Sequence, residues 1–104
     1  MKTDRIDRLG KDKYFLAIRD IIRQTYGFKA HIVLFGSRAA ERETAYSDYD
    51  IAIISELDDR MKKLFTVKEK LEESNIPFKV DVLDYYSTSN LLRKEIDRGI
   101  IWID

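Results

Sequence analysis

The chain has 104 residues, of which 44% are hydrophobic and 37% charged, and its 19 basic side chains balance 19 acidic ones. This composition is typical of a folded domain and excludes a disordered chain, which would combine fewer apolar residues with a large net charge. A chain without net charge or cysteine offers no overall field for nucleic acid or membrane, and no disulfide, zinc-thiolate or thiol-nucleophile chemistry.

The length fits one domain that spans residues 1–104. Residues 1–13 are charged throughout and lack an apolar core, so we expect neither a signal peptide nor a membrane span, and a cytoplasmic protein. Apolar residues then recur at spacings of three and four over residues 14–26, which predicts an amphipathic helix. Gly27 follows where a helix-ending glycine is expected.

Two strands are predicted on either side of a polar stretch. Residues 30–35 are continuously apolar, as expected for a strand buried on both faces, and Gly36 and Ser37 interrupt it, with room for one helical turn after them. His31, the only histidine, is predicted to be a packed residue without a functional role. Residues 49–54 form a second strand, because its isoleucines favour a pleated, half-buried surface.

The second half of the chain continues this alternation. A helix is predicted next, with an apolar face formed by Leu57, Met61, Leu64, Phe65 and Leu71. Residues 78–83 form a third strand, Ser87 or Ser89 caps a last helix that runs to Asp97, and residues 100–103 form a short strand. The alternation predicts an α/β or α+β domain, with helices packed on a small mixed sheet.

Two aspartates open the second strand. Because side chains alternate between the faces of a strand, Asp48 and Asp50 emerge on the same face, about 7 Å apart along the chain. Carboxylates so placed repel each other unless a cation lies between them, and oxygen-rich clusters suit Mg²⁺ or Mn²⁺ better than zinc. The alternative is a solvated turn before the strand. A metal at this position would in turn indicate a substrate that carries phosphate.

Gly36 and Ser37 lie where a buried strand ends, so their amide groups can point at an anion. Ser37 can also cap a following helical turn, and Arg38 supplies a planar fork of donors suited to phosphate oxygens. For Arg38, an ordinary surface position is an equal alternative. We therefore predict that Gly36, Ser37 and Arg38 bind the phosphates of a nucleotide.

A third acid, Asp81, lies inside the apolar run of residues 78–83. An acid in the middle of a strand is seldom buried without a partner. If this strand neighbours the strand of Asp48, Asp81 can complete the metal site or act as the base that activates an acceptor hydroxyl. The alternatives are an edge-strand acid facing water, or Asp84 in the same role.

These motifs together carry a family resemblance. Residues 34–39, residues 47–53, the strand around Asp81 and the closing residues 96–102 resemble the DNA polymerase β-like nucleotidyltransferase superfamily. Within it they resemble the minimal nucleotidyltransferases, or MNT proteins, that are encoded beside HEPN-domain proteins. The resemblance implies a polymerase β palm-like fold. Many relatives read Gly-Ser-x-Ala-Arg-Gly, whereas this chain has Ala40 and Glu41 at the last two positions, and Arg42 is a candidate to replace the missing charge.

The resemblance also implies an activity. Asp48 and Asp50 would hold two Mg²⁺ ions, Asp81 would complete the carboxylate triad, and Gly36 with Ser37 would bind the triphosphate of ATP. The chain would then be a protein adenylyltransferase that transfers AMP to a tyrosine of a HEPN ribonuclease toxin, and so an antitoxin of a toxin–antitoxin system. Base preference, acceptor and assembly as a homo- or hetero-oligomer stay open.

Two alternatives remain at this point. A small molecule such as an aminoglycoside could be the acceptor in the same chemistry. The second alternative is a weak or inactive domain that neutralises its partner by binding alone, which Ala40 and Glu41 favour. Tyr85 and Tyr86 could stack on a base, although packing in the core or at its rim is the simpler interpretation.

Overall fold

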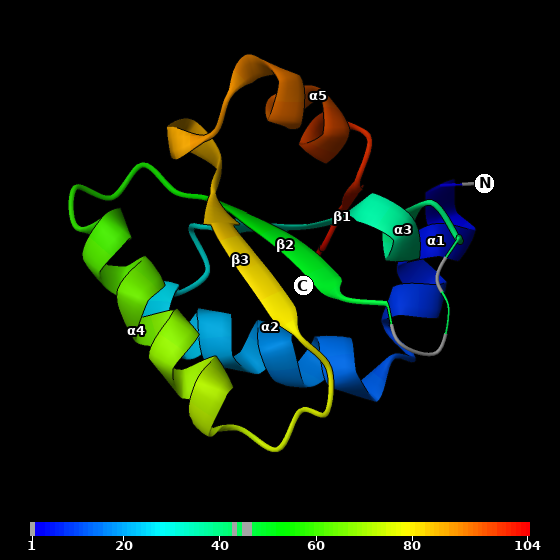
Figure 1. The fold of residues 1–104 in the computed structure, drawn as a ribbon, viewed down its shortest axis with the longest axis horizontal. Coiled ribbons are helices and arrows are strands. Elements are labelled where there is room, and N and C mark those ends of the chain that lie inside the picture. The colour runs from blue at the N-terminus through cyan, green and yellow to red at the C-terminus, as the bar shows by residue number, and fades with distance from the viewer. Residues whose placement is uncertain (1, 43, 45–46) are drawn as a thin grey trace.

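The computed structural model describes residues 2–42, 44 and 47–104, with side chains from residue 5 onward. Its elements alternate along the chain as the sequence predicts (Figure 1). In order they are α1 (Lys2–Leu9), α2 (Lys13–Tyr26), β1 (His31–Phe35), α3 (Gly36–Ala39), β2 (Tyr49–Ile54), α4 (Arg60–Glu73), β3 (Val80–Asp84), the 3₁₀ turn η1 (Tyr85–Ser87), α5 (Asn90–Asp97) and β4 (Ile100–Ile101).

The four strands form one mixed sheet in the order β3-β2-β1-β4. Strand β1 pairs antiparallel with both β2 and β4, whereas β2 and β3 run parallel. The parallel pair is connected through α4, which is the crossover that parallel neighbours require. A mixed sheet with helices packed on it confirms the predicted fold class.

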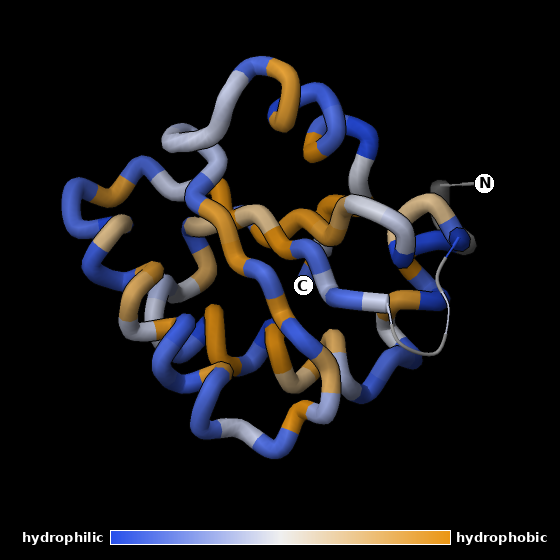
Figure 2. Tube along the Cα trace, in the orientation of Figure 1, coloured by the Kyte–Doolittle hydropathy of each residue, from blue (hydrophilic) through white to orange (hydrophobic). Residues whose placement is uncertain are grey.

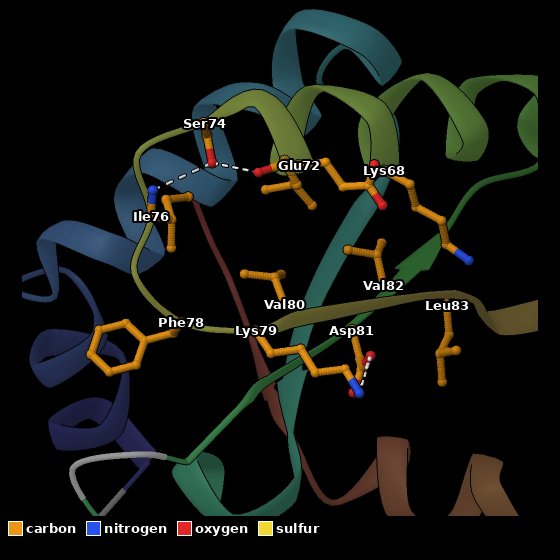
Figure 3. Close-up of a pocket in the computed structure, with 11 residues that line it drawn as sticks. Lys68, Glu72, Ser74, Ile76, Phe78, Lys79, Val80, Asp81, Val82 and Leu83 are labelled. Atoms are coloured by element: carbon orange, nitrogen blue, oxygen red, sulfur yellow. Dashed lines mark hydrogen bonds and ion pairs between the residues drawn. The ribbon is translucent and has the colours of Figure 1, made fainter.

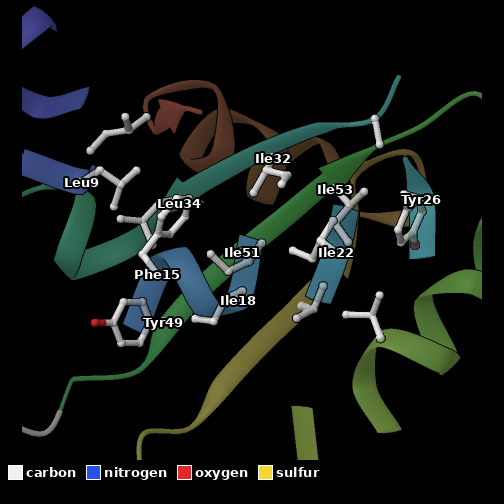
Figure 4. Close-up of a cluster of buried hydrophobic side chains, with 14 of the residues drawn as sticks. Leu9, Phe15, Ile18, Ile22, Tyr26, Ile32, Leu34, Tyr49, Ile51 and Ile53 are labelled. Carbon is white, nitrogen blue, oxygen red and sulfur yellow. The ribbon is translucent and has the colours of Figure 1, made fainter. Parts of the chain in front are cut away.

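The two faces of the sheet are covered differently. Along β2, Tyr49, Ile51 and Ile53 point to the face that α2 and α4 cover, where they are fully buried in the main core (Figure 4). The opposite face carries a smaller cluster of Val33, Phe35, Ala52 and Ile96 beneath α5. Figure 2 shows hydrophobic residues following one another along β1, while α4 alternates between hydrophilic and hydrophobic residues. The face that carries this smaller cluster is only partly covered by helices.

Helix α2 agrees with its prediction at both ends. The side chain of Asp12 caps its start, accepting hydrogen bonds from the backbone N–H groups of Tyr14 and Phe15. Gly27 ends it with φ +80°, a left-handed conformation in which glycine avoids the penalty of a Cβ. Cap and stop signals encoded within a few residues thus set the bounds of this helix.

The apolar face predicted for α4 is only partly correct. Leu64 and Val67 are buried and Leu71 is half-buried, because these positions face the sheet. Met61 and Phe65, which lie one step around the helix, are 49% and 65% exposed. The apolar periodicity of the sequence alone could not distinguish the buried side of α4 from the adjacent exposed side.

One helix at the start of the chain was not predicted, and the prediction for His31 at the start of the sheet is wrong. The structure contains a helix, α1, in the charged N-terminal segment, where Leu9 is buried but too few apolar residues recur to show a period. His31 is exposed rather than packed, because it occupies the first position of β1. In the part of the chain that is described, no helix is long and apolar enough to cross a membrane.

Candidate active site

Asp50 and Asp81 are direct partners in the pairing of β2 with β3. Neighbouring strands lie about 4.8 Å apart, and partner residues in a parallel pair point to the same face, so the two carboxylates emerge side by side. Asp48 immediately precedes β2 and, two residues before Asp50, belongs to the same face. The structure thus brings the three predicted acids to one edge of the partly covered face.

The charges of this cluster act on one another. Burial raises the pKa of the Asp50 carboxyl, and the negative charges of Asp81 and Asp48 raise it further, while Lys79 lowers it. The Lys79 ammonium lies 3.8 Å from Oδ1 of Asp81, and the two side chains are 69% and 43% exposed. Lys79 is a site residue that sequence reasoning missed, although its position two residues before Asp81 places it on the same face of the strand.

Gly36 brings the turn after β1 against this cluster. It adopts φ +76° at the start of α3, and a Cβ at this position would collide with Oδ2 of Asp50. Ser37 follows inside the helix, so the prediction that it caps a helical turn is wrong, since Phe35 occupies the N-cap position. The predicted phosphate-binding turn and the predicted metal ligands are therefore neighbours.

Arg38 has partners within the protein. Its Nε and Nη2 donate hydrogen bonds to the carbonyl oxygen of Ser47 at 3.1 and 2.8 Å. Its Cζ lies 4.0 Å from the centroid of the Tyr49 ring. The role of Arg38 as a phosphate ligand stays a prediction, and these contacts are ones that the sequence pattern did not reveal.

Asp84 has the environment of a structural residue. Its carboxylate is buried, lies 3.2 Å from Nε of Arg60, and accepts a hydrogen bond from the Ser87 hydroxyl at 2.7 Å. Being three residues from Asp81, it projects from the opposite face of β3. The geometry therefore favours Asp81 over Asp84 as the third acid of the site.

A groove of 460 Å³ lies along the edge of the sheet between α4 and β3, and residues from both faces of β3 line it, Asp81 among them. Figure 3 shows Val80 and Val82 pointing from β3 toward α4, while Lys79, Asp81 and Leu83 point away from it. A second hollow, of 300 Å³, adjoins Gly36 between the ends of α3 and α5. Ala40, Arg42 and Arg98 help to line it, so two arginines border the hollow next to the turn, whereas position 40 contributes no cation.

The carboxylates of Asp48, Asp50 and Asp81 are chemically suited to bind a divalent cation. Within residues 5–42, 44 and 47–104, no three histidine or acidic side chains converge closely enough to form a ready-made metal cage. Asp48, Asp50 and Asp81 are nevertheless close enough for two of them to raise the pKa of the third, and a divalent cation would relieve that repulsion. Carboxylate oxygens are the ligands that Mg²⁺ prefers.

Comparison with known families agrees with this geometry. The sequence matches the family described as "Polymerase beta, Nucleotidyltransferase" over residues 18–103, which includes every predicted site residue. The chain belongs to this nucleotidyltransferase family. The resemblance found in the motifs is thereby confirmed, and the mixed sheet is consistent with the fold of this family.

Within the nucleotidyltransferases, the chain is similar to one curated relative in particular. The chain is 42% identical over 69 residues to the probable protein adenylyltransferase MntA of Haemophilus influenzae, a minimal nucleotidyltransferase. The match covers 66% of this chain and 60% of the relative, so the chain spans less than two thirds of that protein's length. The homology supports a transferase of nucleotidyl groups.

Proposed function

We propose that this nucleotidyltransferase is a Mg²⁺-dependent protein adenylyltransferase that moves AMP from ATP to a tyrosine hydroxyl of a partner protein. The observation that carries the proposal is the pairing of Asp50 with Asp81 beside the turn at Gly36. In this proposal the carboxylates would bind metal and the backbone amides at Gly36 would bind phosphate, so that both would contact one triphosphate. The kinship with MntA supports AMP as the transferred group and a protein as the acceptor.

Each residue of the site would have its own role in this reaction. Asp48 and Asp50 hold the metal ions, and the backbone at Gly36 and Ser37 binds the triphosphate. Bound Mg²⁺ supplies charge stabilisation for both the attacking and the leaving oxygen. Asp81 accepts the proton of the acceptor hydroxyl as its oxygen forms a bond to the α-phosphorus. The bond from the α-phosphorus to the bridging oxygen breaks, and pyrophosphate leaves.

A macromolecular acceptor suits the openness of the site. Asp81 and Lys79 lie at its rim with much of their side chains exposed, where the surface of another protein can reach them. By its family resemblance, the chain would modify a tyrosine of a HEPN ribonuclease toxin and act as its antitoxin. The exposed site supports this proposal over a small-molecule acceptor, which would need to be enclosed to bind tightly.

A second candidate is neutralisation by binding alone, without transfer. Position 40 carries an alanine where many relatives place an arginine, so the hollow beside Gly36 lacks a phosphate-binding cation at that point. Weaker nucleotide binding would leave a domain that silences its partner simply by covering it. Arg42 and Arg98 at the same hollow are the residues that could compensate.

The test is the intact mass of the partner that co-purifies with the chain, before and after incubation with ATP and Mg²⁺. We expect the partner to gain AMP units with the unmodified chain, and to gain none with Asp48→Asn or in the presence of EDTA. Asp58→Asn is a matched control, because Asp58 is an exposed acid outside the site. A complex that stays intact but never changes mass, with any of the four nucleotides, would support binding alone.

A further inference from the structure

Arg38 joins the turn at Gly36 to the segment that carries the acids. It lies in the last turn of α3, two residues after Gly36. Its Nε and Nη2 both donate to the carbonyl oxygen of Ser47, at 3.1 and 2.8 Å. Ser47 is bonded directly to Asp48, so this forked hydrogen bond fixes the backbone from which the first acid projects.

The same guanidinium group lies on an aromatic platform. Its Cζ is 4.0 Å from the centroid of Tyr49 and 5.0 Å from that of Phe78, and these two rings contact each other edge to face. Tyr49 separates Asp48 from Asp50, and Phe78 lies in the segment that leads into β3. Arg38 thus contacts the entrances to both strands that carry the acids.

Further hydrogen bonds fix the position of Tyr49. Its hydroxyl donates to the Asp12 carboxylate, with the two oxygens at 2.8 and 3.0 Å, and Asp12 also caps α2. The backbone N–H of Tyr49 donates to the carbonyl oxygen of Lys79 at 3.0 Å, which continues the pairing of β2 with β3. The platform under Arg38 is therefore anchored to a helix and to the neighbouring strand.

The face on which Arg38 lies decides between two roles. Side chains alternate along β2, so the ring of Tyr49 points to the core face, and the carboxylates of Asp48 and Asp50 point to the other. A guanidinium group stacked on Tyr49 and bonded to Ser47 is directed away from the side where the triphosphate would lie. To bind phosphate, Arg38 would have to break its contacts with both Tyr49 and Ser47.

We infer that Arg38 is a positioning residue, which sets the metal-binding geometry of Asp48 and Asp50 through Ser47 and Tyr49 instead of binding phosphate. The inference rests on the proposed metal site. Groups that orient metal ligands from behind commonly change metal affinity by about 10- to 100-fold when they are removed. Phosphate ligands, by contrast, change nucleotide affinity whether or not metal is present.

Two separate titrations of the full chain test the inference. Mn²⁺ binding is followed by the electron paramagnetic resonance signal of the free ion, and ATP binding is measured by calorimetry in EDTA. For Arg38→Met we expect Mn²⁺ affinity to fall on the order of 10- to 100-fold, with ATP affinity in EDTA changed less than about twofold. Arg38→Lys keeps the charge but loses the fork, and should give an intermediate loss of Mn²⁺ affinity.

Arg19→Met is the matched control. Arg19 also stacks on an aromatic ring, with its Cζ 5.5 Å from the centroid of Trp102, and also donates hydrogen bonds, to Asp20, but it lies on α2 away from the acids. The same substitution there should leave both titrations unchanged. If Arg38→Met does not fold, as judged by circular dichroism, the test rests on Arg38→Lys. A loss of Mn²⁺ affinity in that variant supports the inference, and a loss of ATP affinity in EDTA contradicts it.

The outcomes separate this inference from the proposed function. Weaker ATP binding in EDTA with unchanged Mn²⁺ binding would identify Arg38 as a phosphate ligand and overturn the inference. Unchanged values in both titrations would overturn it too, provided that Asp48→Asn loses Mn²⁺ binding. If Asp48→Asn binds Mn²⁺ as tightly as the unmodified chain, the metal site itself is wrong, and both the inference and the proposed function fall.

Discussion

The backbone of Gly36 lies directly against the carboxylate of Asp50, so that a Cβ at position 36 would collide with Oδ2 of that carboxylate. This contact joins two segments that are fourteen residues apart, because β1 and β2 pair with Phe35 opposite Asp50. The turn proposed to bind phosphate and the strand proposed to bind metal therefore cannot move independently.

Gly36→Ala should strongly slow nucleotidyl transfer and lower stability. The left-handed conformation costs a residue with a Cβ about 1–2 kcal/mol, and the collision displaces Asp50 in addition. We expect the transfer rate to fall by about 100-fold or more, the scale of losing a preorganised charge-stabilising group. Urea unfolding and the rate of partner modification measure the two effects.

Gly27→Ala is the control for backbone strain. Gly27 has φ +80°, close to that of Gly36, but a Cβ there would meet no atom within 4 Å. The variant should lose similar stability from the strain alone and keep its transfer rate. Equal losses of activity in the two variants would show that instability, and not displacement of Asp50, explains the effect.

Asp50→Asn should raise thermal stability at neutral pH. Burial and the charges of Asp81 and Asp48 raise the pKa of this carboxyl above its usual 3.8, so the folded state holds the proton more tightly than the unfolded chain does. The associated stability is present below the usual pKa and is lost as pH rises through the raised value. Thermal melts across that range should show a smaller decline for Asp50→Asn.

Added Mg²⁺ gives the complementary result. A cation that binds only the folded state stabilises it, so Mg²⁺ should raise the melting midpoint of the unmodified chain and have little effect on Asp50→Asn. Equal shifts in both proteins would mean that Mg²⁺ binds elsewhere. A lower midpoint for Asp50→Asn without Mg²⁺ would contradict the predicted repulsion.

Asp84→Asn should lower stability and leave transfer intact. Asp84 is buried beside Arg60 and accepts a hydrogen bond from Ser87, so removing its charge weakens a buried network by about 1–3 kcal/mol. Asp81→Asn should show the opposite pattern, with transfer lost and stability nearly unchanged, because Asp81 is 43% exposed. Denaturant unfolding and transfer rates of the two variants, compared directly, test the assignment of the third acid.

Glu41→Gly should stabilise the chain. Glu41 adopts φ +58°, and it occupies the place of the second glycine in the family motif that the chain resembles. Relief of this strain is worth about 1 kcal/mol, against a smaller loss of the exposed 3.5 Å ion pair with Arg8. Glu41→Ala keeps the strain and loses the ion pair, so its unfolding free energy should fall slightly. A Glu41→Gly protein less stable than Glu41→Ala would refute the argument.

The sequence by itself determined the local geometry of this protein. Alternation along residues 49–54 placed Asp48 and Asp50 on one face, and the cap at Asp12 with the stop at Gly27 set the ends of α2. The glycine and serine after β1 predicted the turn at Gly36. Each of these features depends on residues a few positions apart, so the periodicity and the conformational preferences of the chain are sufficient to specify them.

Tertiary structure alone decided which of these features meet. The parallel pairing of β2 with β3 put Asp81, rather than Asp84, beside Asp50, and packing turned Arg38 toward Tyr49. It also buried Val67 while leaving Met61 and Phe65 exposed on the same helix. These outcomes depend on register and on contacts between distant segments, which are set by the packing of the whole core and not by any local pattern.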